Sequence, residues 1–112
     1  MRPLYHPSLD EITVQGILYA LSDPVRVQIV MELAGADCAK NCSTFLNAGG
    51  GEPLPKSTLS QHMKVLREAG LIRSERKGVE LNNCTRCAEL EGRFGGMLQA
   101  ILEAYKKERK RG

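Results

Sequence analysis

The chain has 112 residues and a mass of 12.3 kDa, a size that fits one compact domain and excludes most multidomain enzymes. Hydrophobic residues make up 42% and charged residues 26%, which is ordinary for a globular protein and excludes wholesale disorder. The aromatic residues are two Phe and three Tyr, with no Trp. The core must therefore be aliphatic, and stacking platforms for single-stranded nucleic acid are not expected.

The formal net charge of +3 is distributed unevenly along the chain. Residues 1–55 carry a net charge of −3, residues 56–77 carry +4 and residues 78–112 carry +2. A basic central segment is typical of a surface that binds a polyanion, and a merely solvated face is the alternative explanation.

No apolar run approaches the roughly 18 residues that a membrane-spanning helix needs, and residues 1–7 lack the apolar stretch of a secretory signal. We therefore expect a cytoplasmic protein with no membrane partner. Thiols in that compartment are normally reduced, so structural disulfides are not expected.

Two helices are predicted in the N-terminal part. Apolar residues at mostly helical spacing predict the first over residues 12–21. Asp23 and Pro24 then supply an N-cap carboxylate and a proline at the first helical position. The second helix is dense in aliphatic residues over 25–34, and Gly35 offers a stop.

The segment after Gly35 shows weak periodicity, with a short helix or turn expected over 42–48 and a flexible connection over 49–53. Order resumes at Pro55 with an amphipathic helix that ends at Gly70. Its inner face is formed by Leu59, Met63, Leu66 and Ala69.

Beyond this helix, Leu71-Ile72 and the alternating residues 73–82 predict a β-hairpin with a basic tip around Lys77-Gly78. A long apolar stripe at helical spacing follows, with a bend expected at Gly95-Gly96. The stripe consists of Leu90, Phe94, Met97, Leu98, Ile101, Leu102 and Tyr105. It needs a partner surface, which in so small a domain is expected to be a second copy of the chain.

Together these elements predict a mainly α fold with a small β-hairpin wing, a single winged helix-turn-helix domain over residues 1–112. The ordered core is expected over 8–105, with residues 106–112 forming a solvated, mobile basic tail.

This fold reads double-stranded DNA with one helix, which needs short hydrogen-bonding side chains near its N-terminus and longer basic ones at its margins. The first requirement is met by Ser57, Thr58, Ser60 and Gln61, and the second by Lys56, Lys64 and Arg67. Three basic residues assigned to the hairpin tip, Arg73, Arg76 and Lys77, are predicted to contact DNA backbone or minor groove.

Two stretches, ALSDPVRVQIV at 20–30 and KSTLSQHMKVLREAGLI at 56–72, resemble the ArsR-type (ArsR/SmtB) bacterial repressors. With the wing and last helix, the resemblance covers about residues 9–105. It implies a homodimer built on the first and last helices, which binds an operator of two-fold symmetry and releases it when an effector binds. It places DNA contacts on Ser57, Thr58, Ser60, Gln61, His62, Arg76 and Lys77.

Two residues in this region allow a second interpretation. A hydrogen bond of His62 inside the protein is as plausible as a DNA contact, because histidines at the edge of a core usually find internal partners. Pro55 stands where the family commonly has a serine cap. At the first helical position a proline is tolerated, but the side-chain cap is lost.

The four cysteines form two pairs, Cys38-x3-Cys42 and Cys84-x2-Cys87, at spacings that suit a zinc ion held by four thiolates. The segment near Cys38 is expected to pair with the return strand of the wing, which would bring the two pairs together. Lys40 and Arg86 lie inside the pairs, where positive charge favours thiolate.

The resemblance does not supply this site, because metal-sensing members place cysteines on the recognition helix, or Asp and His on the last helix. This sequence has neither. Three explanations stay open: a zinc site, a disulfide redox switch, or small buried or unreactive cysteines. Zinc is the only cofactor suggested.

Nucleophilic catalysis would need a histidine base beside a Cys or Ser. The two histidines are His6, in a segment expected to be frayed, and His62, on the presumed recognition helix. We therefore expect no enzyme. The alternative to a DNA-binding regulator is a winged-helix module that binds protein and lacks specific DNA binding, and salt dependence of DNA binding would separate the two.

Overall fold

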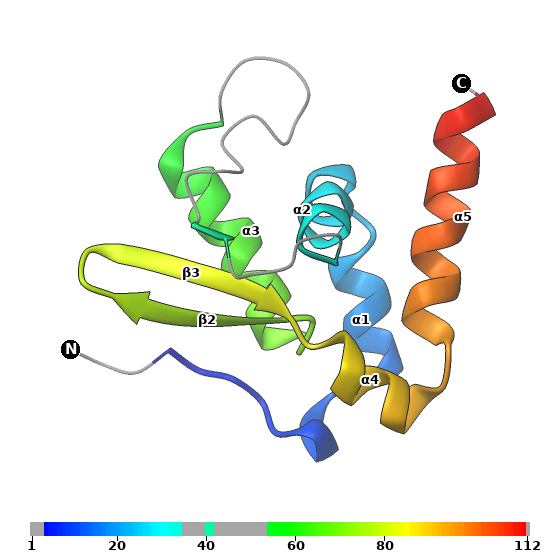
Figure 1. Ribbon diagram of the computed structural model, residues 1–112, viewed down its shortest axis with the longest axis horizontal. Coiled ribbons are helices and arrows are strands. Elements are labelled where there is room, and N and C mark those ends of the chain that lie inside the picture. Colours follow the sequence, from blue (N-terminus) through cyan, green and yellow to red (C-terminus); the bar gives the residue numbers. More distant parts are fainter. Residues whose placement is uncertain (1–3, 35–39, 42–53, 112) are drawn as a thin grey trace.

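The structure, a computed structural model, describes residues 4–34, 40–41 and 54–111 (Figure 1). A 3-10 turn, η1 (Leu9–Glu11), precedes α1 (Val14–Ala20), α2 (Pro24–Ala34), β1 (Lys40–Asn41) and α3 (Lys56–Glu68). The hairpin strands β2 (Ile72–Lys77) and β3 (Glu80–Thr85) follow, and then α4 (Cys87–Phe94) and α5 (Met97–Arg111). This is the mainly helical fold with a hairpin wing that the sequence predicts.

Side-chain caps fix where the first two helices begin. Thr13 Oγ1 accepts a hydrogen bond from Gly16 N at 3.0 Å, so α1 starts two residues later than the predicted span of 12–21. Asp23 Oδ1 accepts from Val25 N at 2.8 Å, which confirms the N-cap predicted for α2.

The recognition helix α3 begins without a side-chain cap. Pro55 is its N-cap, not the first helical residue that the sequence suggested, and has extended ψ of 143°. Its carbonyl accepts from Leu59 N at 3.0 Å. Leu59, Met63 and Leu66 are buried as predicted, which fastens one face of α3 to the core.

The sheet has the strand order β1-β3-β2, with all pairs antiparallel. Lys40 lies opposite Asn83, which confirms that the segment near Cys38 pairs with the return strand of the wing. Lys77 lies opposite Glu80, so the hairpin turns at Gly78 and Val79. Gly78 has φ of +64°, a conformation that glycine adopts at no cost.

The predicted bend at Gly95-Gly96 separates α4 from α5, and Gly95 has φ of +64°. Helix α5 continues through Arg111, so residues 106–111 of the predicted basic tail are helical, and their mobility stays a prediction. Lysine, arginine and glutamate are good helix formers, and positive charge is favourable near a helix C-terminus. The described fold also starts before residue 8, because Pro7 is buried.

The core is aliphatic, as the composition requires. Its fully buried side chains come from the N-terminal helices, α3, β2 and α4, and include Ile17, Ile29, Leu66, Ile72 and Leu90. In the described ranges, no helix is long and apolar enough to cross a membrane. The short helix predicted over 42–48, the connection over 49–53, Cys38 and Cys42 lie outside the described residues.

Candidate nucleic-acid interface

The outward face of α3 carries the short polar side chains that the sequence assigned to it. All four are exposed, as are two lysines: Ser57, Thr58, Ser60, Gln61, Lys56 and Lys64. Since the opposite face is buried in the core, this polar face is held at fixed orientation toward solvent. It presents hydroxyl and amide groups that donate and accept hydrogen bonds, with ammonium groups beside them.

The wing brings only part of the predicted basic set to its tip. Arg76 is exposed on β2, one residue before the end of the strand, and Lys77 is the last residue of β2. Arg73 lies at the other end of β2, opposite Cys84, and its Nη2 is 3.5 Å from Glu89 Oε2 of α4. The placement of Arg73 at the hairpin tip was therefore wrong; it lies at the base of the wing.

His62 has the internal partner that the sequence left open. Arg26 Nη1 of α2 lies 3.3 Å from His62 Nδ1. A guanidinium can only donate, so Nδ1 is the acceptor in this contact and carries no proton. The ring is half-buried, so part of it remains accessible to solvent. The DNA contact assigned to His62 from the sequence stays a prediction.

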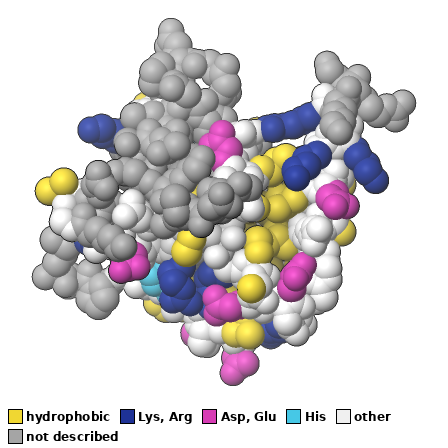
Figure 2. Space-filling model, in the orientation of Figure 1, with side chains coloured by type: hydrophobic (Ala, Val, Ile, Leu, Met, Phe, Trp, Pro, Cys, Tyr) yellow, Lys and Arg dark blue, Asp and Glu magenta, His cyan; other side chains and the backbone are white. Residues whose placement is uncertain are grey.

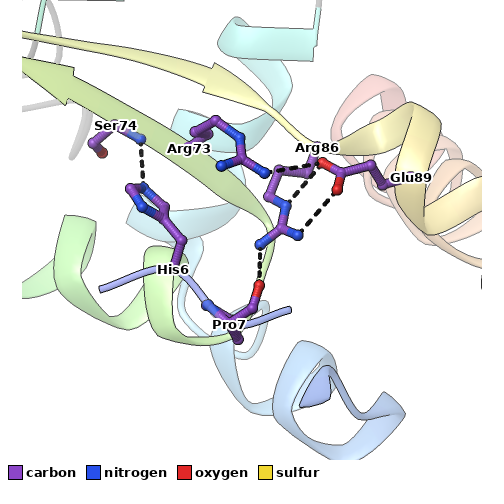
Figure 3. Close-up of polar contacts among 6 residues, drawn as sticks. All are labelled: His6, Pro7, Arg73, Ser74, Arg86 and Glu89. Carbon is purple, nitrogen blue, oxygen red and sulfur yellow. Dashed lines mark hydrogen bonds and ion pairs between the residues drawn. The ribbon is translucent and has the colours of Figure 1, made fainter. Parts of the chain in front are cut away.

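A polar cluster at the base of the wing was not predicted (Figure 3). Arg86, between β3 and α4, donates from Nη1 to Pro7 O at 2.8 Å, from Nε to Glu89 Oε2 at 2.9 Å and from Nη2 to Glu89 Oε1 at 3.1 Å. His6 Nε2 accepts from Ser74 N at 3.0 Å. The segment expected to be frayed is therefore docked on β2.

These contacts set the charge state of the cluster. Hydrogen bonds from Arg86, followed by the charges of Arg86 and Arg73, hold the pKa of Glu89 below its usual range, although partial burial opposes this. The guanidinium of Arg86 thus donates to Glu89 and Pro7, and its predicted effect on the cysteines stays a prediction. The spacing of Arg86 and Glu89, three residues apart, was the only local signal for this cluster.

Cys84 and Cys87 are free thiols in the structure, the first exposed and the second half-buried. Cys87 is the first residue of α4 and lines a groove between α4 and α5 whose floor includes Leu98 and Leu102. Across residues 4–34, 40–41 and 54–111, three or more His, Cys, Asp or Glu side chains do not gather as a metal site would require. The zinc hypothesis therefore depends on Cys38 and Cys42, outside these ranges.

Comparisons with known proteins agree with this geometry. A family model described as a helix-turn-helix domain matches residues 21–75. The HTH-type transcriptional repressor SmtB of Mycobacterium tuberculosis, in strains CDC 1551 / Oshkosh and ATCC 25618 / H37Rv, is 35% identical to the chain over 66 residues. The match covers 58% of this chain and 44% of SmtB, so the chain spans less than half the length of the curated relatives it matches.

Two solved structures share the fold. One is the homodimeric winged helix-turn-helix DNA-binding domain of Mb0332 from Mycobacterium bovis, described as a possible ArsR-family transcriptional regulator. Its TM-score is 0.61 at 21% identity, covering 85% of this chain and 82% of that one. An ArsR-like transcriptional regulator from Rhodococcus sp. RHA1 has a TM-score of 0.52 at 25% identity, covering 83% and 89%.

These relatives are described as regulators, which agrees with the prediction that the chain is not an enzyme. The family match spans α2, α3 and the start of the wing, the elements that carry the polar face of α3. The chain therefore has a winged helix-turn-helix fold and is similar to transcriptional regulators of the ArsR/SmtB type.

Proposed function

We propose that this chain is a sequence-specific, double-stranded DNA-binding transcriptional regulator, with α3 in the major groove and the wing beside it. The observation that carries the proposal is the two-sided character of α3. Its buried residues fasten the helix to the core, while its exposed face carries small polar side chains that let the backbone approach base edges.

Individual roles follow from side-chain chemistry. The Gln61 amide can donate to and accept from one adenine edge, and the hydroxyls of Ser57, Thr58 and Ser60 can meet bases or phosphates. The phosphate contacts would come from Lys56, Lys64, Arg67, Arg76 and Lys77, which belong to the segment of net charge +4. Arg73 belongs to the same segment, and its ion pair with Glu89 holds it at the wing base.

Gln61→Ala is expected to weaken binding to the specific site by about 1–3 kcal/mol, or roughly 5- to 150-fold, and to relax base preference. Arg76→Ala should instead weaken all sequences alike and flatten the log–log salt slope by about 0.9 per chain, or about 1.8 for the proposed dimer. Fluorescence anisotropy with a duplex from upstream of the gene and with a scrambled duplex, at several salt concentrations, measures both effects.

Gln28→Ala, the same substitution on α2 at a side chain that bonds Glu32 of its own helix, is the matched control and should leave affinity unchanged. If Gln61→Ala kept the base preference of the wild type, α3 would not be the recognition helix. Absence of saturable, salt-dependent binding to the upstream duplex would favour the alternative, a winged-helix module that binds protein.

A homodimer is the proposed form of the regulator. On α1, Val14, Leu18 and Tyr19 are 41%, 52% and 65% exposed, which is unusual for large hydrophobic side chains in so small a domain. Figure 2 shows further hydrophobic side chains gathered beside α5. A second copy packed on α1 and α5 would cover such surfaces, and two recognition helices would then fit an operator of two-fold symmetry. The anisotropy titration should accordingly saturate at two chains per operator.

For regulation, the proposed effector acts through the cysteines, as a metal ion or an oxidant. Cys84 is exposed and Cys87 is half-buried against the core, so neither thiol is fully enclosed by the protein. Both lie at the junction of wing and α4, where a bond between them or to a metal would alter the base of the wing.

Elemental analysis of protein purified without an affinity tag under reducing conditions is expected to give about one zinc per chain for a four-thiolate site. Cys84→Ser with Cys87→Ser should then abolish the metal and change operator affinity. If the chain holds no zinc, and zinc, arsenite and peroxide change operator affinity identically in wild type and double variant, the cysteines are not the sensor.

A further inference from the structure

We propose that residues 4–8 form a strap that positions the wing, with His6 as a latch that opens when its ring takes up a proton. The strap runs beside β2 in Figure 1 and reaches the wing base in Figure 3. It joins two parts of the chain that are 68 residues apart in sequence.

The latch is a single hydrogen bond at the free edge of the wing. Ser74 lies opposite Asn83 in the register of β2 and β3, yet its N–H donates to His6 Nε2 at 3.0 Å. Its hydroxyl donates to Asn83 Oδ1 at 2.5 Å, so Ser74 is held between strap and strand. A backbone N–H can only donate, so the bond exists only while Nε2 carries no proton.

The rest of the strap is anchored independently of His6. Pro7 is buried and its carbonyl accepts from Arg86, whose side chain is 2% exposed. Further along, Arg93 Nη1 donates to Leu9 O and to Ile12 O. Loss of the latch therefore frees the strap near His6 and leaves the later anchors in place.

The surroundings of His6 oppose a positive charge. Burial lowers the pKa of its ring, as do the guanidinium groups of Arg73 on β2, Arg67 on α3 and Arg86 after β3; a hydrogen bond with the Leu4 backbone acts in the opposite direction. The nearby carboxylate, Glu89, is already engaged by Arg86 and Arg73. Protonation would thus remove the acceptor and add a fourth cation to this cluster.

The direction of the pH effect follows. With the docked pKa of His6 below the value of about 6.5 for a free ring, the undocked form takes up a proton first as pH falls. The latch is therefore fully effective above about pH 6.5 and weakens below it, by up to about tenfold per pH unit, until the docked ring is itself protonated.

The consequence for DNA binding rests on the proposed function. The strap bonds the strand that carries Arg76 and Lys77, so releasing it removes a restraint on where these cations lie relative to α3. DNA affinity of the wild type is then expected to fall below about pH 6.5 by up to about tenfold per pH unit. We treat His6 as a positioning residue, since it acts through Ser74 and the strand.

The test follows the Ser74 amide by NMR in the full chain between about pH 8 and pH 5, a range that brackets the titration of a free imidazole. In the wild type the amide shift should titrate with the His6 ring, with a midpoint below 6.5. His6→Gln keeps an uncharged acceptor, so the Ser74 amide should keep the chemical shift of its hydrogen-bonded state at every pH. His6→Ala removes the acceptor, so this shift should be absent at every pH. In His62→Gln, which changes the other histidine, the shift of the Ser74 amide should titrate as it does in the wild type.

Two results would overturn the proposal. A Ser74 amide that does not titrate in the wild type, or that titrates equally in His6→Gln, excludes the latch. A Ser74 titration without any difference in the pH dependence of DNA affinity between wild type and His6→Gln excludes the positioning of the wing. If no duplex binds at any pH, the proposed function fails, and the amide titration still decides whether the latch exists.

Discussion

Gly70→Ala is expected to lower the free energy of unfolding by about 2–4 kcal/mol, because the alanine would meet both backbone strain and a steric clash. Gly70 has φ of +85°, and an added Cβ would lie 2.3 Å from Ile12 Cδ1 and 2.4 Å from Cγ1. Ile12 is 2% exposed, so its side chain has no room to withdraw into solvent. Urea denaturation followed by circular dichroism measures the loss.

Gly92→Ala is the matched control. Gly92 lies within α4, where an added Cβ would meet nothing within 4 Å. Alanine is the better helix former by about 0.8–1.0 kcal/mol, so this variant should be as stable as the wild type or more so. Equal stability of the two variants would contradict the tight approach of Ile12 to Gly70.

Arg26→Met is expected to lower the free energy of unfolding by about 2–4 kcal/mol, because it removes the donor to the buried Ala20 carbonyl and breaks two further polar contacts. Arg26 is 9% exposed. Its Nε donates to Ala20 O at 2.6 Å and its Nη2 to Tyr19 O at 3.3 Å, carbonyls at the C-terminal end of α1. The third contact is to His62 Nδ1 on α3. Urea denaturation again gives the magnitude.

Two further substitutions test whether the loss of stability comes from the contacts of Arg26 or from the change of an arginine to methionine. Arg26→Lys keeps the charge but offers a compact ammonium that cannot reach three acceptors in the same geometry, so it should recover only part of the loss. Arg109→Met on the exposed surface of α5 makes the same chemical change and should alter stability by less than about 0.5 kcal/mol. An Arg26→Met variant as stable as Arg109→Met would show that the three polar contacts of Arg26 do not stabilise the fold.

Features controlled by local chemistry were predictable from the sequence. Asp23 and Pro24 fix the start of α2 through bonds within a few residues, and glycines at 95 and 96 break a helix regardless of what lies around it. The exposed face of α3 followed from helical periodicity, because the positions of Leu59, Met63 and Leu66 leave the intervening residues outside. These features account for most of the predicted interface.

Features that depend on distant contacts were not predictable. Nothing near His6 in sequence indicates that Ser74 will donate to it, and Pro7 gives no sign that Arg86 will bind its carbonyl. Arg73 was predicted at the tip of the hairpin, but β2 extends over six residues up to the turn at residues 78–79. Arg73 is near the start of that strand and therefore lies at the base of the wing. Which contact His62 makes likewise required knowing where α2 crosses α3.

The strap also bears on how the protein behaves when it is concentrated. In the described sheet β2 is an edge strand, and edge strands with unpaired N–H groups are templates on which other chains can assemble. His6 accepts the hydrogen bond of the Ser74 N–H, so this edge is partly covered while the His6 ring is unprotonated. Acid that protonates His6 would uncover it, so the conditions that loosen the wing are also those that favour strand-to-strand aggregation.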